Sequence, residues 1–210
     1  MRRSRELILA AAEKYFSDYD TPLTMSELAH LAGVGNATLY RRYSSIDEVI
    51  RELYGRLLGA LQSVADDVLA QPSAWDGIVA LVIGIANTLQ DHPAIPRLNR
   101  RMVEIDDGHR FASQWDDALD QLVAGAQAEG KLRPDVNSND ITFAAFRVGS
   151  YANLPPSERD RVIGRQIGII LDGIRVDGVR STLPGSPISS AEVHEIFRYE
   201  VAHPLRPPTE

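Results

Sequence analysis

The stretch that decides the fold runs from Leu23 to Ile50 and reads LTMSELAHLAGVGNATLYRRYSSIDEVI. It opens with a capping box: the Thr24 hydroxyl can accept the backbone N–H of Glu27, and the Glu27 carboxylate can accept the N–H of Thr24. Gly33 and Gly35 follow soon after. Because glycine adopts turn conformations readily, they predict that the helix is short and ends in a tight turn.

A second short helix is predicted after this turn. Asn36 can cap it, and its sequence is NATLYRRY. Ser45 and Glu48 then form a second capping box, which opens a third helix. Two short helices around a tight turn containing glycine form a helix-turn-helix, whose second helix is built to lie in the major groove of DNA.

The side chains of the second helix suit such a groove. Hydroxyl and guanidinium donors gather on it, and no carboxylate lies between Asn36 and Ser45. The donors are Thr38, Tyr40, Arg41, Arg42 and Tyr43. Asn36 and the small Ala37 begin the helix, where the backbone must come closest to base edges. We expect Leu39 to attach the helix to a core formed by Leu28, Ala29, Leu31 and Val34. The alternative is a short surface helix of an ordinary helical protein, which the capped boundaries and the basic, aromatic sequence disfavour.

The ordered combination of motifs resembles a known family. An N-terminal amphipathic helix leads into T-x-x-x-L-A-x-x-A-G-V from Thr24, then T-L-Y-x-x-Y from Thr38, a cap and a long helix. Over residues 5–58 this pattern resembles the DNA-binding domain of the tetracycline-repressor (TetR) family of bacterial regulators. Beyond residue 58 only length, helical pattern and overall plan are similar. The resemblance implies a homodimeric regulator, usually a repressor, that leaves its operator DNA when a small molecule binds the C-terminal domain.

The resemblance also implies roles for the residues of the motif. Thr24, Tyr40 and Tyr43 would contact phosphate groups of the DNA. The residues that would face the groove are Asn36, Ala37, Thr38, Arg41 and Arg42. Where the family commonly has a lysine near the start of the next helix, this chain has Ile46. One phosphate contact expected in the family is therefore in question here.

The composition is that of an ordinary globular protein. The 210 residues are 44% hydrophobic and 24% charged, which suits one core-sized domain and a small N-terminal domain. No run reaches the roughly 18 uncharged apolar residues of a membrane-spanning helix, and Glu6 and Glu13 argue against a signal peptide. The absence of cysteine excludes disulfides and thiolate metal sites. We expect a cytoplasmic protein without membrane contact.

The net charge of −7 is unevenly distributed. Residues 1–60 contain eight Lys or Arg and eight Asp or Glu, so the rest of the chain carries the whole negative charge. The arginines expected to meet DNA are Arg2, Arg3, Arg5, Arg41 and Arg42. An acidic body limits nonspecific binding to DNA, so affinity must come from this local patch.

Hydrophobic periodicity predicts an all-α fold with about nine or ten helices. Beyond the stretch above, helices are expected over residues 4–18, 46–69, 75–90, 110–130, 141–153 and 157–176. Two prolines predict a short, bent element at residues 93–102. The first helix should bury one stripe formed by Leu7, Ile8, Ala11, Ala12, Tyr15 and Phe16.

We divide the chain into a DNA-binding domain (residues 1–50), a ligand-binding and dimerisation domain (51–180), and a C-terminal segment (181–210). The segment comprises a linker, a short extra helix over residues 188–199 and a disordered tail. The helix over residues 46–69 begins in the first domain and continues into the second.

Small residues are frequent in the last two large helices. They are Ala144, Ala145, Gly149, Ala152, Gly164, Gly168 and Gly173. Glycine inside a helix costs about 1 kcal/mol relative to alanine, so a packing reason is expected. One reason is a homodimer through residues 141–153 and 158–176 as a four-helix contact; the other is close packing within one chain. The family plan has its dimer helices here, which favours the dimer.

By resemblance, a small-molecule cavity would be enclosed by the helices of residues 75–90, 93–103, 111–130 and 141–153. The candidate contacts are Asn87, Leu89, Leu98, Asn99, Met102, Phe111, Trp115, Phe143, Arg147 and Tyr151. Most apolar residues on a helix stripe are simply core residues. The apolar bias predicts a mainly hydrophobic effector, whereas an inward Arg147 would indicate an anionic group.

No catalytic constellation is visible: the chain has no glycine-rich phosphate loop, no G-x-S-x-G elbow and no H-E-x-x-H helix. The segment Asp106-Asp107-Gly108-His109 has metal-ligand residue types without a known spacing, so a solvated loop is favoured. We predict no enzyme activity, no metal and no cofactor. A helical protein-interaction module with a non-functional N-terminal domain, or a small all-α enzyme, stays open as an alternative. DNA binding through Tyr40, Arg41 and Tyr43 distinguishes a regulator from both.

Overall fold

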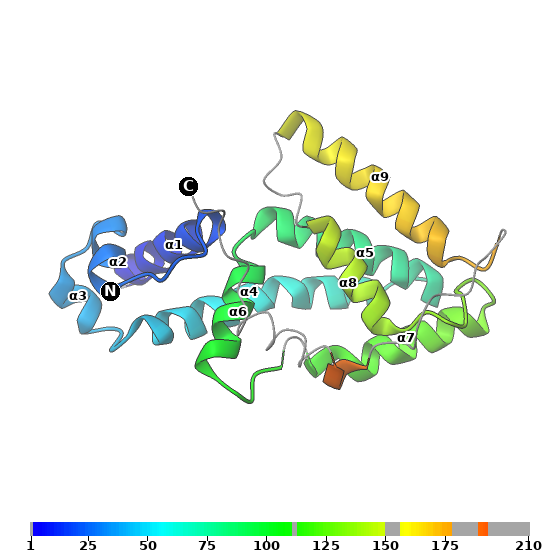
Figure 1. Ribbon diagram of the computed structural model, residues 1–210, viewed down its shortest axis with the longest axis horizontal. Coiled ribbons are helices and arrows are strands. Elements are labelled where there is room, and N and C mark those ends of the chain that lie inside the picture. The colour runs from blue at the N-terminus through cyan, green and yellow to red at the C-terminus, as the bar shows by residue number, and fades with distance from the viewer. Residues whose placement is uncertain (1, 111–112, 150–155, 178–188, 193–210) are drawn as a thin grey trace, which may run out of the picture. The chain divides into compact units, whose positions relative to one another are not determined.

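The computed structural model describes residues 2–110, 113–149, 156–177 and 189–192 (Figure 1). Within these ranges the fold is all-α, as predicted, and the β-type pairing is limited to an isolated bridge between Leu132 and Arg175. The elements are α1 (Arg2–Asp18), α2 (Met25–Leu31), α3 (Asn36–Tyr40), α4 (Ile46–Leu69), α5 (Ala74–Asp91), α6 (Ile95–Ile105), the 3-10 helix η1 (Ser113–Trp115), α7 (Asp116–Ala128), α8 (Ser138–Gly149) and α9 (Pro156–Ile174).

The helices form two compact units. The first contains residues 1–59 and 92–109, and the second contains residues 60–91 and 110–210. Helix α4 contributes its first part to the first unit and its second part to the second. Helix α6 belongs to the first unit, where it packs beside α1, although the predicted boundaries assign it to residues 51–180.

The core of the first unit is built from the buried faces of α1, α2, α3, α4 and α6. Its fully buried side chains include Ile8, Phe16, Leu28, Leu39, Leu53 and Leu98. Two core predictions are wrong. Leu7 is 45% exposed, and Leu9 is buried on α1 instead; Leu31 is 53% exposed at the end of α2. Both errors concern residues beside a buried row, and the sequence pattern did not distinguish the row that packs from its neighbour.

Helix α6 is a regular helix of 11 residues rather than the bent element predicted from its prolines. Pro93 precedes the helix, and Pro96 lies in its first turn, where no intrahelical bond is lost with the missing N–H. The Arg97 guanidinium donates to the carbonyl oxygens of Phe16 and Ser17, at 3.1 and 2.6 Å. It thereby satisfies carbonyl groups at the C-terminal end of α1, where a positive charge is favourable.

The remaining boundaries agree with the sequence to within a few residues. Helix α4 has the predicted bounds. Helix α7 starts later than predicted because η1 precedes it. Asn137 caps α8, since its side chain accepts from the Asp140 N–H at 2.9 Å and its own N–H donates to the Asp140 carboxylate at 3.0 Å. The predicted end of this helix at residues 150–153, the linker, most of the extra helix and the tail lie outside the described residues.

The second unit is organised around α5, which packs against α7, α8 and α9. The sequence of α5, AWDGIVALVIGIANTLQD, is almost wholly apolar, which suits this central position. A Cβ atom added to Gly149 of α8 would lie 2.6 Å from the Cβ atom of Leu89 on α5. Glycine is therefore required there for the close approach of two helices within one chain.

Helix α9 is the outermost helix of this unit in Figure 1. Ile163 packs into the core beside Ala86 and Val148. At the other end, backbone hydrogen bonds of 3.0 Å join Arg133 N to Ile174 O and Val176 N to Lys131 O. The helix is thus held along one side and at its C-terminal end.

No single helix in the described part of the chain is long and apolar enough to cross a membrane, and α5 and α6 reach that threshold only when they are combined.

Candidate nucleic-acid interface and small-molecule cavity

The helix-turn-helix is formed by α2 and α3, and its turn contains a residue in the left-handed backbone conformation. Gly33 has a φ angle of +64°. Its N–H donates to His30 O at 3.1 Å, and the Val34 N–H donates to Ala29 O at 3.0 Å. These two bonds form a Schellman motif, which closes the C-terminal end of α2. The predicted glycine turn is therefore confirmed, with Gly33 as the residue whose backbone conformation requires glycine.

The start of α2 has the predicted capping box. The Glu27 N–H donates to the Thr24 hydroxyl at 3.3 Å, and the Thr24 N–H donates to the Glu27 carboxylate at 2.8 Å. The Thr24 hydroxyl also donates to this carboxylate, at 2.6 Å. These hydrogen bonds from Thr24 hold the pKa of Glu27 below its usual value. The hydroxyl hydrogen of Thr24 is therefore bound to Glu27 and would have to change partner to contact a phosphate group.

Helix α3 differs from its prediction in two details. It ends at Tyr40 rather than at Tyr43, and its N-cap residue is Gly35 rather than Asn36, without a side-chain cap. Asn36 is the first residue of the helix, so its side chain is not used in capping.

The surface of α3 separates into two faces. Leu39 is fully buried and fixes the helix to the core of the first unit. Asn36, Ala37, Tyr40 and Arg41 are exposed. Their spacing of i, i+1, i+4 and i+5 puts these four side chains on one side of the helix. Tyr40 is 57% exposed, so its ring and hydroxyl group are accessible on this face.

Two further residues predicted to face the groove are half-buried. Thr38 lies within α3, and Arg42 follows it. The Arg42 guanidinium approaches the Ser4 hydroxyl of α1, with 3.5 Å between Nη2 and Oγ. Both side chains lie at the margin of the exposed face.

Tyr43 lies in the core, unlike Tyr40. It is only 4% exposed, and its hydroxyl oxygen makes no hydrogen bond of normal geometry within the described residues. Burial, followed by the nearby Glu52 carboxylate, raises the pKa of Tyr43 to about 12. Glu52 accepts from the Arg5 guanidinium at 2.6 Å. In this structure Tyr43 therefore supports the end of the helix-turn-helix from inside, and Arg5 is paired with an acid.

The second capping box is formed only in part. The Glu48 N–H approaches the Ser45 hydroxyl at 3.4 Å, as predicted. The Glu48 carboxylate accepts instead from Ser44, with 2.7 Å to its N–H and 2.8 Å to its hydroxyl. Ile46 begins α4 and is half-buried, so this position offers an apolar side chain rather than a cation.

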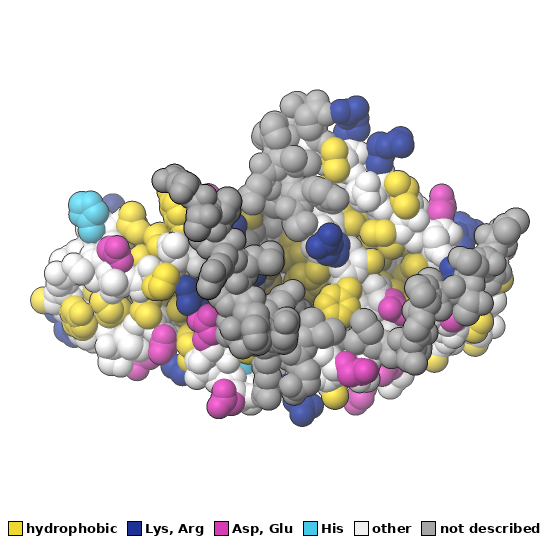
Figure 2. Space-filling view, in the orientation of Figure 1, with side chains coloured by type: hydrophobic (Ala, Val, Ile, Leu, Met, Phe, Trp, Pro, Cys, Tyr) yellow, Lys and Arg dark blue, Asp and Glu magenta, His cyan; other side chains and the backbone are white. Residues whose placement is uncertain are grey.

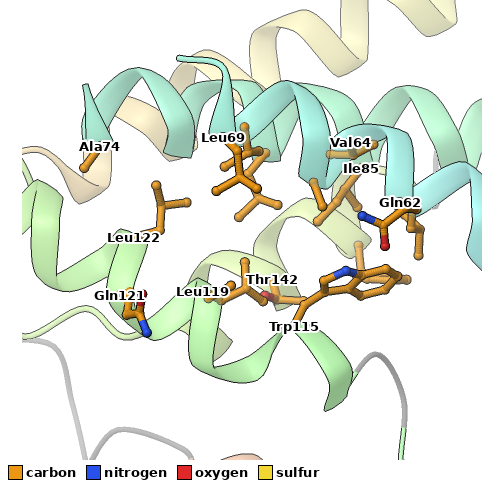
Figure 3. Close-up of a pocket in the computed structure, with 16 residues that line it drawn as sticks. Gln62, Val64, Leu69, Ala74, Ile85, Trp115, Leu119, Gln121, Leu122 and Thr142 are labelled. Atoms are coloured by element: carbon orange, nitrogen blue, oxygen red, sulfur yellow. The ribbon is translucent and has the colours of Figure 1, made fainter. Parts of the chain in front are cut away.

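A cavity of about 410 Å³ lies within the second unit (Figure 3). This volume falls in the range of small-molecule sites, about 300–1,000 Å³. Its walls come from α4, α5, η1, α7 and α8. The lining residues are Leu61, Gln62, Val64, Ala65, Val68, Leu69, Ala74, Leu81, Ile85, Trp115, Ala118, Leu119, Gln121, Leu122, Thr142 and Phe146.

Of the residues predicted to contact a ligand, Trp115 lines this cavity. Leu98, Asn99 and Met102 are buried on α6 in the first unit. Asn87 and Arg147 are exposed, Leu89 is buried against Gly149, and Phe143 is half-buried outside the lining. Phe111 and Tyr151 lie outside the described residues.

Asn99 is occupied by a polar cluster with Tyr54 and His109. The Tyr54 hydroxyl donates to Asn99 Oδ1 at 3.2 Å, and His109 Nε2 lies 3.0 Å from the same oxygen. Burial raises the pKa of Tyr54 above its usual value. The cluster explains why a polar residue is buried on α6, and it links the end of the predicted acidic loop to α4 and α6.

The sequence did not predict that α4 supplies part of the cavity wall. Leu61, Val64 and Val68 form one apolar row on this helix and line the cavity. Their spacing of three and four residues is the same for a core face and for a cavity wall. The sequence pattern alone therefore does not distinguish a core face from a cavity wall.

In the space-filling view the second unit presents hydrophobic side chains interspersed with charged ones on the visible face (Figure 2). Across the described ranges, no group of three or more His, Cys, Asp or Glu could hold a metal ion.

The chain resembles known proteins in its N-terminal sequence and in its overall helical fold. Residues 8–53 match the family model described as bacterial regulatory proteins, tetR family. A TetR transcriptional regulator from Streptomyces coelicolor is 26% identical with a TM-score of 0.52, over 81% of this chain and 98% of that chain. No curated protein matches the sequence significantly.

Two more distant structures share the fold. The ketosteroid transcriptional regulator of Mycobacterium tuberculosis is 18% identical with a TM-score of 0.65, over 82% of this chain and 95% of that chain. A gamma-butyrolactone receptor is 15% identical with a TM-score of 0.63, over 96% of this chain and 98% of that chain. Two proteins whose names refer to different small molecules, a ketosteroid and a gamma-butyrolactone, therefore share the helical plan of most of this chain.

Proposed function

The chain belongs, through residues 8–53, to the tetR family of bacterial regulatory proteins, and from this premise we propose that it is a ligand-responsive repressor. It is a DNA-binding transcriptional regulator. The proposal adds that it binds operator DNA as a homodimer in the bacterial cytoplasm and leaves the DNA when a small, mainly hydrophobic effector binds. It includes no catalytic activity, since regulators of this family are usually not enzymes.

The exposed face of α3 is the observation that carries the DNA-binding proposal. It presents amide, phenol and guanidinium groups on Asn36, Tyr40 and Arg41, while Leu39 holds the opposite side in the core. We assign Asn36, Ala37, Thr38, Arg41 and Arg42 to the major groove and Tyr40 to a phosphate group. Amide and guanidinium groups can bond two atoms of one base, and this is how sequence is read in that groove.

We also assign Thr24 and Tyr43 to phosphate groups, but each hydroxyl group must first become available. The Thr24 hydroxyl must leave the Glu27 carboxylate, and the Tyr43 hydroxyl must become accessible. Either change would accompany binding, so these two contacts depend on an adjustment of the first unit that Tyr40 does not need.

The glycines of α9 support the proposed dimer. A Cβ atom added to Gly164, Gly168 or Gly173 would meet no atom within 4 Å in the described part of the chain. Close packing within one chain therefore explains Gly149 but not these three. Ile169, on the same helix, is 59% exposed. A second copy packed against α8 and α9, over residues 141–153 and 158–176, would cover these positions.

The effector step is proposed to act through α4, which belongs to both units. Its second half supplies Leu61, Val64 and Val68 to the cavity wall, and its first half supplies Val49 and Leu53 to the core beneath the helix-turn-helix. A dimer must hold its recognition helices about 34–36 Å apart to reach successive major grooves. An effector that binds more tightly to a conformation with another spacing would shift the population away from DNA.

A titration with DNA tests the proposal. The protein, an Arg41→Ala, Tyr40→Ala double variant and a Lys131→Ala control would be titrated with the DNA upstream of the gene at two salt concentrations. Tight, salt-dependent binding that the double variant loses and the control keeps is expected. If random-sequence DNA selection also yields no preferred site, the chain is a helical interaction module and not a regulator.

A further inference from the structure

The cavity of the second unit is lined by side chains without formal charge. Among the described residues, its polar groups are limited to the amides of Gln62 and Gln121, the Thr142 hydroxyl and the Trp115 indole. Arg147, whose inward position would have indicated an anionic ligand, is exposed and does not line the cavity. A charged molecule would therefore lose its hydration without gaining a counter-charge.

Two of these four polar groups have hydrogen-bond partners within the described residues. The Thr142 hydroxyl donates to Ser138 O at 2.8 Å. The Gln62 side-chain nitrogen donates to the Asp66 carboxylate at 3.1 Å. The Trp115 indole N–H donates to no acceptor in the described part of the chain. Because the indole nitrogen is a donor only, it can be satisfied by an acceptor on a ligand.

Trp115 and Gln62 lie at one end of the cavity, and Ala74 and Leu122 lie at the other (Figure 3). The indole nitrogen is drawn on the side of the ring that faces Gln62. The Trp115 indole and the Gln62 amide thus make this end polar, and the rest of the wall is mainly apolar, with the Thr142 hydroxyl in between and the Gln121 amide near Leu122.

We propose that this cavity takes an uncharged, mainly apolar molecule with one hydrogen-bond acceptor, and that the Trp115 indole N–H donates to that acceptor. That this molecule is the effector rests on the proposed function. The proposal fixes two properties that a hydrophobic wall alone does not: the absence of ligand charge and the position of the acceptor.

Four small probes with a diphenylmethyl skeleton separate these properties. Benzophenone has a carbonyl acceptor, diphenylmethane has none, diphenylacetate is an anion, and benzhydrylammonium is a cation. Their affinities are measured on the full chain by displacement of N-phenyl-1-naphthylamine, an uncharged dye that fluoresces in apolar sites. The matched variants are Trp115→Phe, which keeps the aromatic wall but removes the N–H, and Trp75→Phe, because Trp75 is buried outside the cavity lining.

The expected pattern is specific. Benzophenone binds about three- to ten-fold more tightly than diphenylmethane, as one neutral hydrogen bond allows. This ratio falls to about one in Trp115→Phe and is retained in Trp75→Phe. Both ions bind at least about ten-fold more weakly than benzophenone.

Three results would overturn the inference: no displaceable binding of the dye, equal or tighter binding of either ion, or an unchanged ratio in Trp115→Phe. Failure of the proposed function gives a different result. If the probes bind as expected but none weakens DNA binding, the ligand chemistry of the cavity stands and its role as an effector site does not.

Discussion

Replacing Gly33 by alanine isolates the backbone contribution of the helix-turn-helix. A Cβ atom at this position would meet nothing within 4 Å, but the φ angle is +64°. The left-handed conformation costs an alanine about 1–2 kcal/mol. Alanine also restricts the unfolded chain more than glycine does, which stabilises the folded state by about 0.4–1 kcal/mol. We therefore expect Gly33→Ala to lower the free energy of unfolding by about 1 kcal/mol.

Two other glycines serve as controls. Gly35 has a φ angle of −68° and also has an open Cβ position. Gly35→Ala should leave stability nearly unchanged, because the loss of a favourable N-cap residue offsets the effect on the unfolded chain. Gly130, which closes α7, has a φ angle of +68° and an equally open position. Gly130→Ala should lower stability by the same amount as Gly33→Ala.

The assay combines urea unfolding, followed by circular dichroism, with DNA affinity. A loss of about 1 kcal/mol corresponds to a melting temperature lower by about 2–4 °C for a chain of this size. Gly33→Ala should also weaken DNA binding, because the turn sets the angle of α3, whereas Gly130→Ala should not. An equal stability loss in Gly35→Ala, or equal weakening of DNA binding by Gly130→Ala, would refute the reasoning.

Three further predictions follow from burial, charge and close packing. Leu39→Ala should lower the free energy of unfolding by about 2–5 kcal/mol, as measured by urea titration, because the side chain is fully buried; the exposed Leu31→Ala should change it by less than about 0.5 kcal/mol. Glu27 has a lowered pKa in the folded state, so its contribution to stability is present above its ordinary value of 4.5 and is lost as the pH falls through the lower folded value. As the pH is lowered from about 6 to about 3, the free energy of unfolding should therefore decrease less steeply for Glu27→Gln than for the parent chain. Equal slopes for the two proteins would contradict this. Gly149→Ala should destabilise the chain by about 1–3 kcal/mol, because the new methyl group would overlap the Leu89 side chain, 2.6 Å from its Cβ atom; a melting temperature equal to that of the parent would show that the helices can separate.

The sequence predicted those parts of the fold that depend on local contacts. The Thr24–Glu27 box, the Gly33 turn and the bounds of α4 each rest on residues a few positions apart, and all three are found. The errors concern choices between neighbours. Leu7 and Leu9 both fit an apolar stripe of α1, and only the packing of other helices decides which is buried.

The exposed face of α3 could be predicted from the sequence more fully than the cavity of the second unit. The exposed face of α3 lies on one short helix, so its membership follows from helical periodicity. The cavity is formed where five elements meet, and its shape depends on the distances between them. Trp115, proposed because it lies on a helix that the resemblance places around a cavity, lines this cavity. Leu98 and Asn99 lie outside it because α6 belongs to the first unit.

The central claim is that the exposed face of α3 reads DNA sequence. The most direct measurement is selection from random DNA with the parent chain, Arg41→Ala and Tyr40→Ala, followed by comparison of the base preferences. Arg41→Ala should lose preference at particular base pairs, because a groove contact is removed. Tyr40→Ala should weaken binding to all sequences alike, because a phosphate contact carries no sequence information. An unchanged preference profile in Arg41→Ala would show that the exposed face of α3 does not read base sequence through this residue.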